Sequence, residues 1–182
     1  MLSKASPTHR FRYAVWLPRR APCCTDSKKQ LRSTPFFMHF IPMTKAGVIY
    51  AREESLSAEE FRRVLIESGL GTLRPVDDPE RLKTMLAQAG LIVTARLDQP
   101  GKPLVGVARG VTDSSWCCYV SELAVSSSAQ GFGIGKGLLE EARRQIGPQV
   151  ALFLVSVPDA VGFYERIGME RIADAFWYKR SL

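Results

Sequence analysis

The sequence predicts an α+β domain in which helices cover both faces of a central mixed, mostly antiparallel sheet. Three observations support this fold class. Strand-like runs and apolar helical stripes follow one another between residues 47 and 178. Two consecutive strand-like runs are joined by a short Asp-Gln-Pro-Gly turn, which is typical of an antiparallel hairpin. A strand–helix–strand alternation in the last third predicts one parallel crossover.

Residues 1–45 differ from the rest of the chain in charge and regularity. They hold nine Lys or Arg residues against one acidic residue, whereas residues 46–182 hold 16 against 17. Five prolines interrupt this leader, and it lacks the long apolar stretch of a secretory signal. We therefore expect a basic, disordered leader at 1–45 and one domain at 46–182. The leader could instead be an organellar transit segment, or sequence upstream of a start at Met38 or Met43.

Residue usage excludes several classes of protein. The only two histidines, His9 and His39, lie in the leader, so the domain has no histidine for a Ser/His/Asp triad or an H-E-x-x-H zinc site. The four cysteines form two adjacent pairs without C-x-x-C spacing, so we expect plain thiols and no metal site. No apolar run approaches the roughly 18 residues of a membrane-spanning helix. The near-neutral domain disfavours nucleic acid as a partner.

The first part of the domain predicts a strand at 48–51, two capped helices and three further strands. Ser57 begins the first helix as the N-cap of a capping box, in which the Glu60 side chain reaches back to the backbone. Asp78, followed by Pro79, begins the second helix. The three strand-like runs lie at 91–96, 104–111 and 116–125.

The last third predicts a strand between two helices and a final strand. The run at 150–157 is almost entirely apolar, as is typical of a central strand covered on both faces. A final strand is expected at 172–178. The two helical stripes comprise Leu138, Leu139, Ala142 and Ile146, and then Ala160, Phe163, Tyr164 and Ile167.

A glycine-rich loop precedes the first of these helices. It reads Gln130-Gly131-Phe132-Gly133-Ile134-Gly135-Lys136-Gly137. Small residues let the backbone approach a ligand, and the free N–H groups of a first helical turn favour an anion. The spacing fits neither the Walker nor the dinucleotide-binding pattern. The remaining Gln-x-x-Gly-x-Gly pattern indicates another kind of phosphate-binding loop, with a simple tight turn as the alternative.

From residue 46 to about 180 the chain resembles the GNAT superfamily of acyl-coenzyme A N-acyltransferases. The resemblance rests on Ser-Glu-Leu-Ala-Val at 121–125, on the glycine loop, and on Phe-Tyr-Glu-Arg-Ile-Gly-Met at 163–169. It implies a GNAT-type domain whose parallel strand–helix–strand unit carries the cofactor loop. A weaker likeness, at 103–109 and 176–178, is to the branch that includes plant and cyanobacterial serotonin N-acetyltransferases, and it does not fix the substrate.

The resemblance also implies acetyl-CoA as co-substrate, with no metal. The pantetheine arm would pair with the strand before the loop, and the loop amides would hold the pyrophosphate. Many relatives bind pantetheine through an Asn at the position that Val157 occupies here, so cofactor affinity could be weaker or binding could use other partners. The cofactor-binding residues expected on this basis are Leu123, Ala124, Val125, Gln130, Gly131, Phe132, Gly133, Ile134, Gly135 and Lys136.

Two catalytic candidates follow. The resemblance places Tyr164 where family members commonly carry the tyrosine that protonates the departing sulfur, and a phenol with a pKa of about 10 holds its proton at neutral pH. Its alternative role is packing within the helical stripe. Glu122 is the only carboxylate in the strand before the loop. It could act as general base or bind the ammonium charge, or it could pair within the fold.

The leading hypothesis is an acetyl-CoA-dependent N-acetyltransferase acting on a primary amine of a small molecule. A protein amino-group acetyltransferase and a non-catalytic acyl-CoA-binding module are the alternatives. A third class of function is a protein that associates with nucleic acid through its basic leader. A homodimer is compatible with the sequence. We expect a cytoplasmic protein, or an organellar one if the leader is a transit segment.

Overall fold

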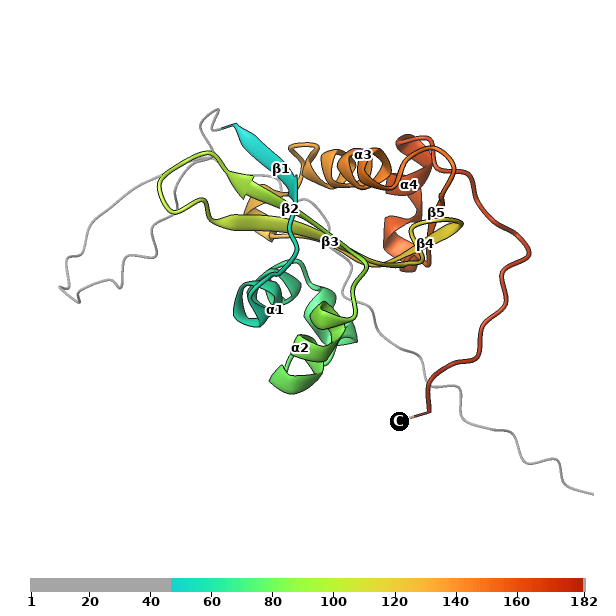
Figure 1. The fold of residues 1–182 in the computed structure, drawn as a ribbon, viewed down its shortest axis with the longest axis horizontal. Coiled ribbons are helices and arrows are strands. Elements are labelled where there is room, and N and C mark those ends of the chain that lie inside the picture. Colours follow the sequence, from blue (N-terminus) through green and yellow to red (C-terminus); the bar gives the residue numbers. More distant parts are fainter. Residues whose placement is uncertain (1–46, 182) are drawn as a thin grey trace, which may run out of the picture. The chain divides into compact units, whose positions relative to one another are not determined.

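Five strands form one sheet in chain order, β1-β2-β3-β4-β5, in a computed structural model that describes residues 47–181 (Figure 1). The strands are β1 Val48–Arg52, β2 Leu91–Leu97, β3 Leu104–Thr112, β4 Cys117–Val125 and β5 Ala151–Leu154. The helices are α1 Ala58–Glu67, α2 Pro79–Ala87, α3 Ile134–Ile146 and α4 Val161–Arg166. Short 3₁₀ helices lie at Leu70–Leu73, Ser127–Ala129 and Pro158–Ala160.

The sheet is mixed, as the sequence predicts. Strands β1 to β4 pair with their neighbours in antiparallel fashion, and β2 and β3 form the expected hairpin. Strand β5 pairs with β4 in parallel, and α3 is the connection between them. This parallel unit carries the glycine loop between β4 and α3.

Each face of the sheet has its own hydrophobic core because successive strand residues point to opposite sides. On one face, Leu138 of α3 packs with Val93 of β2. On the other face, Phe61 and Leu65 of α1 pack with Ile92, the neighbour of Val93. Figure 1 shows α1 and α2 below the sheet and α3 and α4 above it. The fold is therefore an α+β arrangement with helices on both faces.

Both predicted helix caps are present, but one partner differs. The Asp78 side chain accepts from the N–H of Arg81 at 3.0 Å, and the Ser57 hydroxyl accepts from the N–H of Glu60 at 3.5 Å. The expected return contact from the Glu60 carboxylate to the backbone was wrong, because this carboxylate instead pairs with Arg96 of β2 at 2.8 Å. A guanidinium from the sheet provides a charge-assisted partner that outcompetes a backbone N–H.

Two expectations for the last third were wrong. Strand β5 is the last strand of the sheet order and ends at Leu154, and Val150 is the only buried residue of the apolar run at 150–157. The predicted strand at 172–178 is not formed, and residues 170–181 are all exposed. Apolar patterning is a local signal, whereas a strand needs a neighbour to accept and donate its hydrogen bonds.

The predicted leader, 1–45, lies outside the described residues. Among the residues that the structure does describe, no helix is both long and apolar enough to cross a membrane.

A small ion-pair network joins α1 to the sheet. The Arg96 guanidinium donates to Glu53, which follows β1, at 2.7 Å, and also contacts Glu60. Burial alone would raise the pKa of Glu53, but hydrogen bonds from Arg96 and Thr94 and the charge of Arg96 outweigh it and lower the pKa. A lowered carboxyl pKa stabilises the fold above the pKa of the unfolded chain, and this stability is lost as the pH falls through the folded-state pKa.

We predict that Glu53→Gln lowers the free energy of unfolding at neutral pH by up to about 1 kcal/mol, the range for partly exposed ion pairs. The difference from wild type should shrink as the pH falls below the ordinary glutamate pKa and through the lowered pKa of Glu53, where this carboxyl becomes protonated in the folded protein. Urea unfolding at a series of pH values measures it. Glu80→Gln, which removes the exposed pair with Lys83, is the control and should change little. A pH-independent difference for Glu53→Gln would contradict the network's role.

Candidate active site

A cleft opens where β4 and β5 part. The pairing joins Cys117–Val120 to Ala151–Leu154 and then stops, while β4 continues to Val125. The last five residues of β4 therefore have a main-chain edge that β5 does not cover. A cleft of about 640 Å³ lies here, bounded by the end of β4, the glycine loop, the first turn of α3, residues 154–157 and α4.

Most of the predicted site residues come together at this cleft. Ala124 does not, because strand alternation turns its side chain into the core under α1. The Phe132 side chain is 62% exposed and lies outside the cleft lining. Glu122 is buried on the Ala124 face. The predicted residues that do line the cleft are Leu123, Val125, Gln130, Gly131, Gly133, Ile134, Gly135, Lys136 and Tyr164.

Two glycines of the loop are required by backbone conformation. Gly131 has a φ of +85° and Gly133 a φ of +80°, in the left-handed region that side chains disfavour. No atom lies within 4 Å of a Cβ built on either residue, so conformation rather than space selects glycine there. The Gln130 side-chain amide donates to the carbonyl oxygen of Val125 at 2.9 Å and ties the loop to the end of β4.

The loop ends in a helix N-terminus that faces the cleft. Gly133 is the N-cap of α3, and the N–H of Gly137 donates to its carbonyl oxygen at 3.0 Å. The N–H groups of Ile134, Gly135 and Lys136 precede this first bond, so helix geometry gives them no intrahelical acceptor. These donors and the positive end of the helix dipole suit an anionic group such as a phosphate.

The other two glycines are required by packing. A Cβ on Gly135 would lie 3.1 Å from the ring of Phe163 in α4, and a Cβ on Gly137 would overlap the Tyr50 ring of β1. The absence of a side chain at Gly135 thus lets α4 pack against the first turn of α3. Sequence spacing gave no sign of this division of roles among the glycines.

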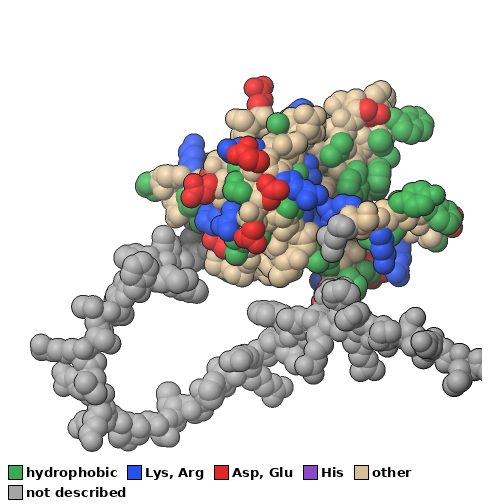
Figure 2. Space-filling model, turned by 90° about the horizontal axis from the view of Figure 1, so that it is seen from below, with side chains coloured by type: hydrophobic (Ala, Val, Ile, Leu, Met, Phe, Trp, Pro, Cys, Tyr) green, Lys and Arg blue, Asp and Glu red, His purple; other side chains and the backbone are tan. Residues whose placement is uncertain are grey.

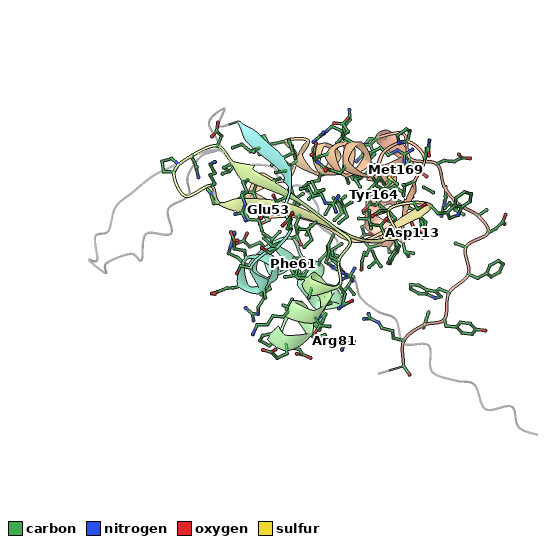
Figure 3. All side chains as sticks on the ribbon, viewed as in Figure 1. Glu53, Phe61, Arg81, Asp113, Tyr164 and Met169 are labelled. Atoms are coloured by element: carbon green, nitrogen blue, oxygen red, sulfur yellow. The ribbon has the colours of Figure 1, made fainter. Side chains whose placement is uncertain are left out.

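Tyr164 is brought to the cleft by the same packing. Its ring meets the Phe163 ring edge-on, with centroids 5.1 Å apart. The side chain is half-buried, and it lines the cleft where α4 comes against the sheet (Figure 3). Burial raises the pKa of the Tyr164 hydroxyl above its ordinary value. The group therefore keeps its proton throughout the neutral range.

Glu122 lies beneath the cleft with both carboxylate oxygens occupied. Oε1 accepts from Arg74 Nε at 2.6 Å and from the Ser121 hydroxyl at 2.8 Å, and Oε2 accepts from Arg109 Nε at 2.5 Å. Its side chain is 1% exposed and is not part of the cleft lining. The sequence left several roles open for Glu122. Of these, pairing within the fold is the one that the structure forms.

Arg74 is a cleft residue that the sequence did not reveal. It follows the 3₁₀ helix Leu70–Leu73, and its guanidinium also donates to the Ser121 carbonyl oxygen at 2.7 Å. It lines the cleft together with Lys136, Arg166 and one acidic residue, Asp159, so the lining is cationic overall. Arg74 sits in an irregular segment without periodicity or motif, which is why sequence reasoning missed it.

Val157 occupies the position where the resemblance implies an Asn in many relatives. The Val157 side chain lines the cleft and is 37% exposed. It can contact a ligand through its methyl groups but cannot form a side-chain hydrogen bond. Hydrogen bonds to an extended ligand at this point must come from the backbone or from other residues.

An uncovered β4 edge beside a helix N-terminus that suits an anion agrees with the arrangement that the resemblance to acyl-CoA acetyltransferases implies. The family model for the acetyltransferase (GNAT) domain matches residues 61–179, more than half of the chain. The chain belongs to the GNAT acetyltransferase family, whose members generally use acetyl-CoA.

Curated relatives are similar over part of their length. The uncharacterized N-acetyltransferase ycf52 of Pyropia yezoensis is 25% identical over 108 residues, 56% of this chain and 62% of that protein. The chloroplastic GCN5-related N-acetyltransferase 2 of Arabidopsis thaliana is 33% identical over 91 residues, 45% of this chain and 34% of that protein. The matches thus span less than two thirds of each of these relatives.

Solved structures share the fold. The GNAT family acetyltransferase SP0256 of Streptococcus pneumoniae superposes with a TM-score of 0.56 at 25% identity, covering 74% of this chain and 100% of that one. The aminoglycoside acetyltransferase meta-AAC0020, from an uncultured soil metagenomic sample and in complex with sisomicin, gives 0.56 at 18% identity, covering 74% and 97%.

We predict that Gly133→Val and Gly133→Asn differ in both stability and cofactor binding. A left-handed backbone costs a side chain roughly 1–2 kcal/mol, most for a β-branched residue and least for asparagine. Gly133→Val should therefore unfold more easily and bind acetyl-CoA more weakly, while Gly133→Asn stays close to wild type. Denaturant unfolding and calorimetric titration with acetyl-CoA measure the two effects. Equal behaviour of the two variants would contradict a conformational role for Gly133.

Proposed function

We propose that this protein is an acetyl-CoA-dependent N-acetyltransferase that acts on a primary amine of a small molecule. The observation that carries the proposal is the uncovered end of β4 beside the N-terminus of α3, with Tyr164 lining the same cleft. A strand edge suits an amide-containing pantetheine arm, and a helix N-terminus suits a pyrophosphate.

The donor set of the cleft fits acetyl-CoA. The backbone of Leu123, Ala124 and Val125 would pair with the pantetheine amides, since this edge of β4 lies beyond the β5 pairing. The amides of the loop and of the first α3 turn, residues 131–136, would hold the pyrophosphate. Lys136 adds a positive charge, and its exposed pair with Glu140 at 3.5 Å restrains it only weakly.

Tyr164 would act as the general acid. A neutral amine attacks the thioester carbonyl, the new C–N bond forms, and the C–S bond breaks. The Tyr164 hydroxyl gives its proton to the departing sulfur and later regains one from solvent. The proton released by the acylated amine leaves to water. The raised pKa of Tyr164 suits this role because the hydroxyl is protonated when the sulfur gains charge.

Glu122 would act through Arg74 rather than on the amine itself. Its carboxylate is buried and already accepts hydrogen bonds from Arg74 and Arg109. Because Arg74 lines the cleft, Glu122 would hold that guanidinium in position and balance its charge. We propose Glu122 as a positioning residue, which leaves the amine to reach its neutral form in solvent.

The size of the cleft supports a small acceptor. Its volume of about 640 Å³ must hold part of acetyl-CoA as well as the acceptor, which leaves room for only a small amine. Ser68, Leu70 and Arg74 line the same cleft as the residues of α4. A protein amino group and a non-catalytic acyl-CoA-binding role are the alternatives.

The basic, acid-poor composition of residues 1–45 supports an organellar location. The Arabidopsis relative carries the name chloroplastic. We propose that the leader acts as a transit segment, with the cytoplasm as the alternative location.

Thiol release from acetyl-CoA, measured across a panel of small amines and lysine-containing peptides, tests the proposal. We expect amine-dependent release with at least one small amine. Release with peptides only would favour a protein acetyltransferase. Calorimetric binding of acetyl-CoA without release on any acceptor would favour the non-catalytic alternative.

We predict that Tyr164→Phe lowers kcat by about 10²- to 10⁴-fold, the usual contribution of general acid catalysis. Affinity for acetyl-CoA should barely change, because the ring still packs on Phe163 and the hydroxyl acts mainly in the transition state. The loss should shrink with an acyl donor whose leaving thiol is more acidic. Steady-state kinetics with both donors measure it, and full turnover by Tyr164→Phe would refute the role.

A further inference from the structure

Arg74 is held at the point where β4 and β5 part. Its Nη2 donates to the Ser121 carbonyl oxygen at 2.7 Å, and its Nε donates to the Glu122 carboxylate at 2.6 Å. In the registers of β3 and β5, Ser121 has no partner, because the β3 register passes from Glu122 to Val120 and the β5 pairing ends at Val120. The guanidinium is thus fixed to the backbone at the end of the β4–β5 pairing.

The Arg74 guanidinium keeps donor capacity for a ligand. A guanidinium has five N–H groups. Among residues 47–181, Nε donates to Glu122, while Nη1 and Nη2 each donate once, to the carbonyl oxygens of Leu73 and Ser121. These three bonds leave one N–H on each terminal nitrogen. The side chain is 20% exposed and lines the cleft, and a carboxylate has the two oxygens that such a pair of donors needs.

The buried cluster around Glu122 has an excess of positive charge. The guanidinium groups of Arg74 and Arg109 share this one carboxylate, and the ion pairs of the described residues give neither of them a second. The Arg109 side chain is only 6% exposed, whereas Arg74 reaches the cleft. A buried charge without a counter-charge is costly. An anionic group in the cleft beside Arg74 would therefore stabilise the cluster.

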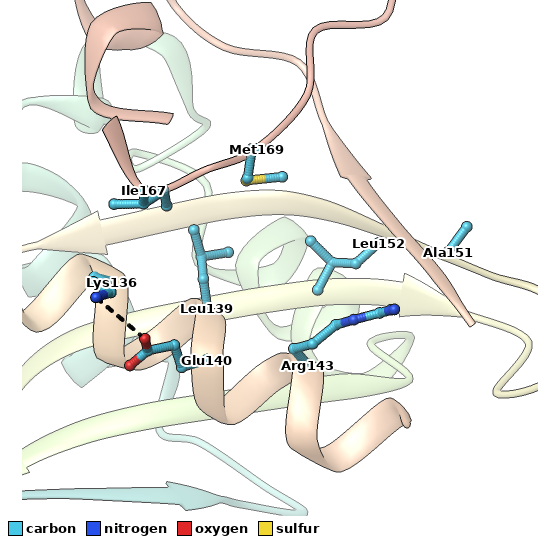
Figure 4. A pocket seen from close by; sticks show the side chains of 8 residues that line it. All are labelled: Lys136, Leu139, Glu140, Arg143, Ala151, Leu152, Ile167 and Met169. Carbon is cyan, nitrogen blue, oxygen red and sulfur yellow. Dashed lines mark ion pairs between the residues drawn. The ribbon is translucent and has the colours of Figure 1, made fainter. Parts of the chain in front are cut away.

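Arg74 lies at one end of the uncovered β4 edge, and the glycine loop lies at the other. The loop is tied to Val125, four residues beyond Ser121, and four residues of strand span about 13 Å. Lys136, the cation of the loop, lies on the first turn of α3 and pairs with Glu140 at 3.5 Å (Figure 4). The two cations therefore serve different parts of the cleft.

The cleft offers little negative charge to an ammonium group. Of the described residues that line it, Asp159 is the one acidic residue, and it is exposed. The Glu122 carboxylate lies beneath the cleft and is not part of its lining. An acceptor with several ammonium groups would meet like charge beside Arg74, whereas an acceptor with its own carboxylate would match that charge.

We propose that Arg74 binds a carboxylate of the acceptor, so that the substrates are small amines that also carry a carboxylate, such as amino acids. This inference rests on the proposed function, in which pantetheine pairs with 123–125 and the thioester lies toward Ser121. An amine that reaches this thioester has the rest of its molecule near Arg74. The guanidinium holds the carboxylate, Glu122 holds the guanidinium from beneath, and the amine is left free to attack.

Paired acceptors test the proposal: ω-amino acids with one to five methylene groups, and the ω-amino amides that differ from them only in the carboxylate. Calorimetric titration into the protein saturated with coenzyme A measures affinity, and thiol release from acetyl-CoA measures turnover. At least one acid should bind to wild type about tenfold or more tightly than its amide, the usual gain from hydrogen bonds to a charged group. Turnover should show the same preference through a lower KM.

Three variants locate the source of this preference. Arg74→Gln should reduce the affinity for each acid to that for its amide, and it should fold because Arg109 still pairs with Glu122. Arg74→Lys keeps the charge without the planar pair of donors and should retain part of the preference. Arg81→Gln, on the exposed side of α2 and outside the cleft lining, removes the same charge and is the matched control, which should behave like wild type.

The two readouts separate this inference from the proposed function. Wild type that does not bind acids more tightly than amides would overturn the inference, as would a preference that persists in Arg74→Gln. Thiol release with neutral amines alone would also overturn it while leaving the acetyltransferase function intact. Binding of the acids that depends on Arg74, without thiol release, would support the carboxylate site and contradict acetyl transfer.

Discussion

The parting of β4 and β5 after Val120 and Leu154 is the feature on which the site depends. Without it, β5 would occupy the main-chain edge of β4 up to Val125, and the cleft would be closed. Because β4 continues past the end of the β5 pairing, its uncovered edge and the N-terminus of α3 face the same space. The left-handed backbone of Gly131 and Gly133 makes the reversal between them possible. A free strand edge and a helix N-terminus suited to an anion are thus joined by a loop of only a few residues.

The side chains around the cleft follow from this backbone arrangement. Because Gly135 has no side chain, the Phe163 ring packs close to its backbone. Helix α4 therefore packs on α3 and brings Tyr164 to the cleft. On the other face of β4, the buried carboxylate of Glu122 holds Arg74 at the cleft wall. A buried carboxylate is tolerated there because guanidinium groups satisfy both of its oxygens. Figure 2 shows acidic and basic side chains interspersed on the face it views, in keeping with the nearly neutral domain.

Local signals allowed much of the fold to be predicted. Caps at Ser57 and Asp78 and apolar periodicity located the helices, the antiparallel hairpin and the parallel unit. The glycine pattern and the family resemblance located nine of the residues that line the cleft. Features that depend on distant partners could not be predicted. The Glu60 carboxylate pairs with Arg96 of β2 instead of with the backbone of its own helix. Arg74 lies at the cleft although it belongs to an irregular segment.

The end of the chain illustrates the same limit. The apolar pattern at 150–157 predicts a strand, of which Ala151–Leu154 form β5, whereas the pattern at 172–178 predicts a strand that the structure does not form. Pattern alone does not say whether such segments meet within one chain, meet between chains or remain apart. In the structure β5 is an edge strand, and residues 170–181 lie exposed beyond α4.

Hydrogen–deuterium exchange with and without saturating coenzyme A tests the central claim most directly. If the cleft between β4 and α3 is the cofactor site, bound coenzyme A should slow amide exchange in 123–125 and 131–136. Peptides from α1 and α2, on the opposite face of the sheet, should be unchanged. Binding measured by calorimetry without protection of these two segments, or with protection elsewhere, would contradict the account.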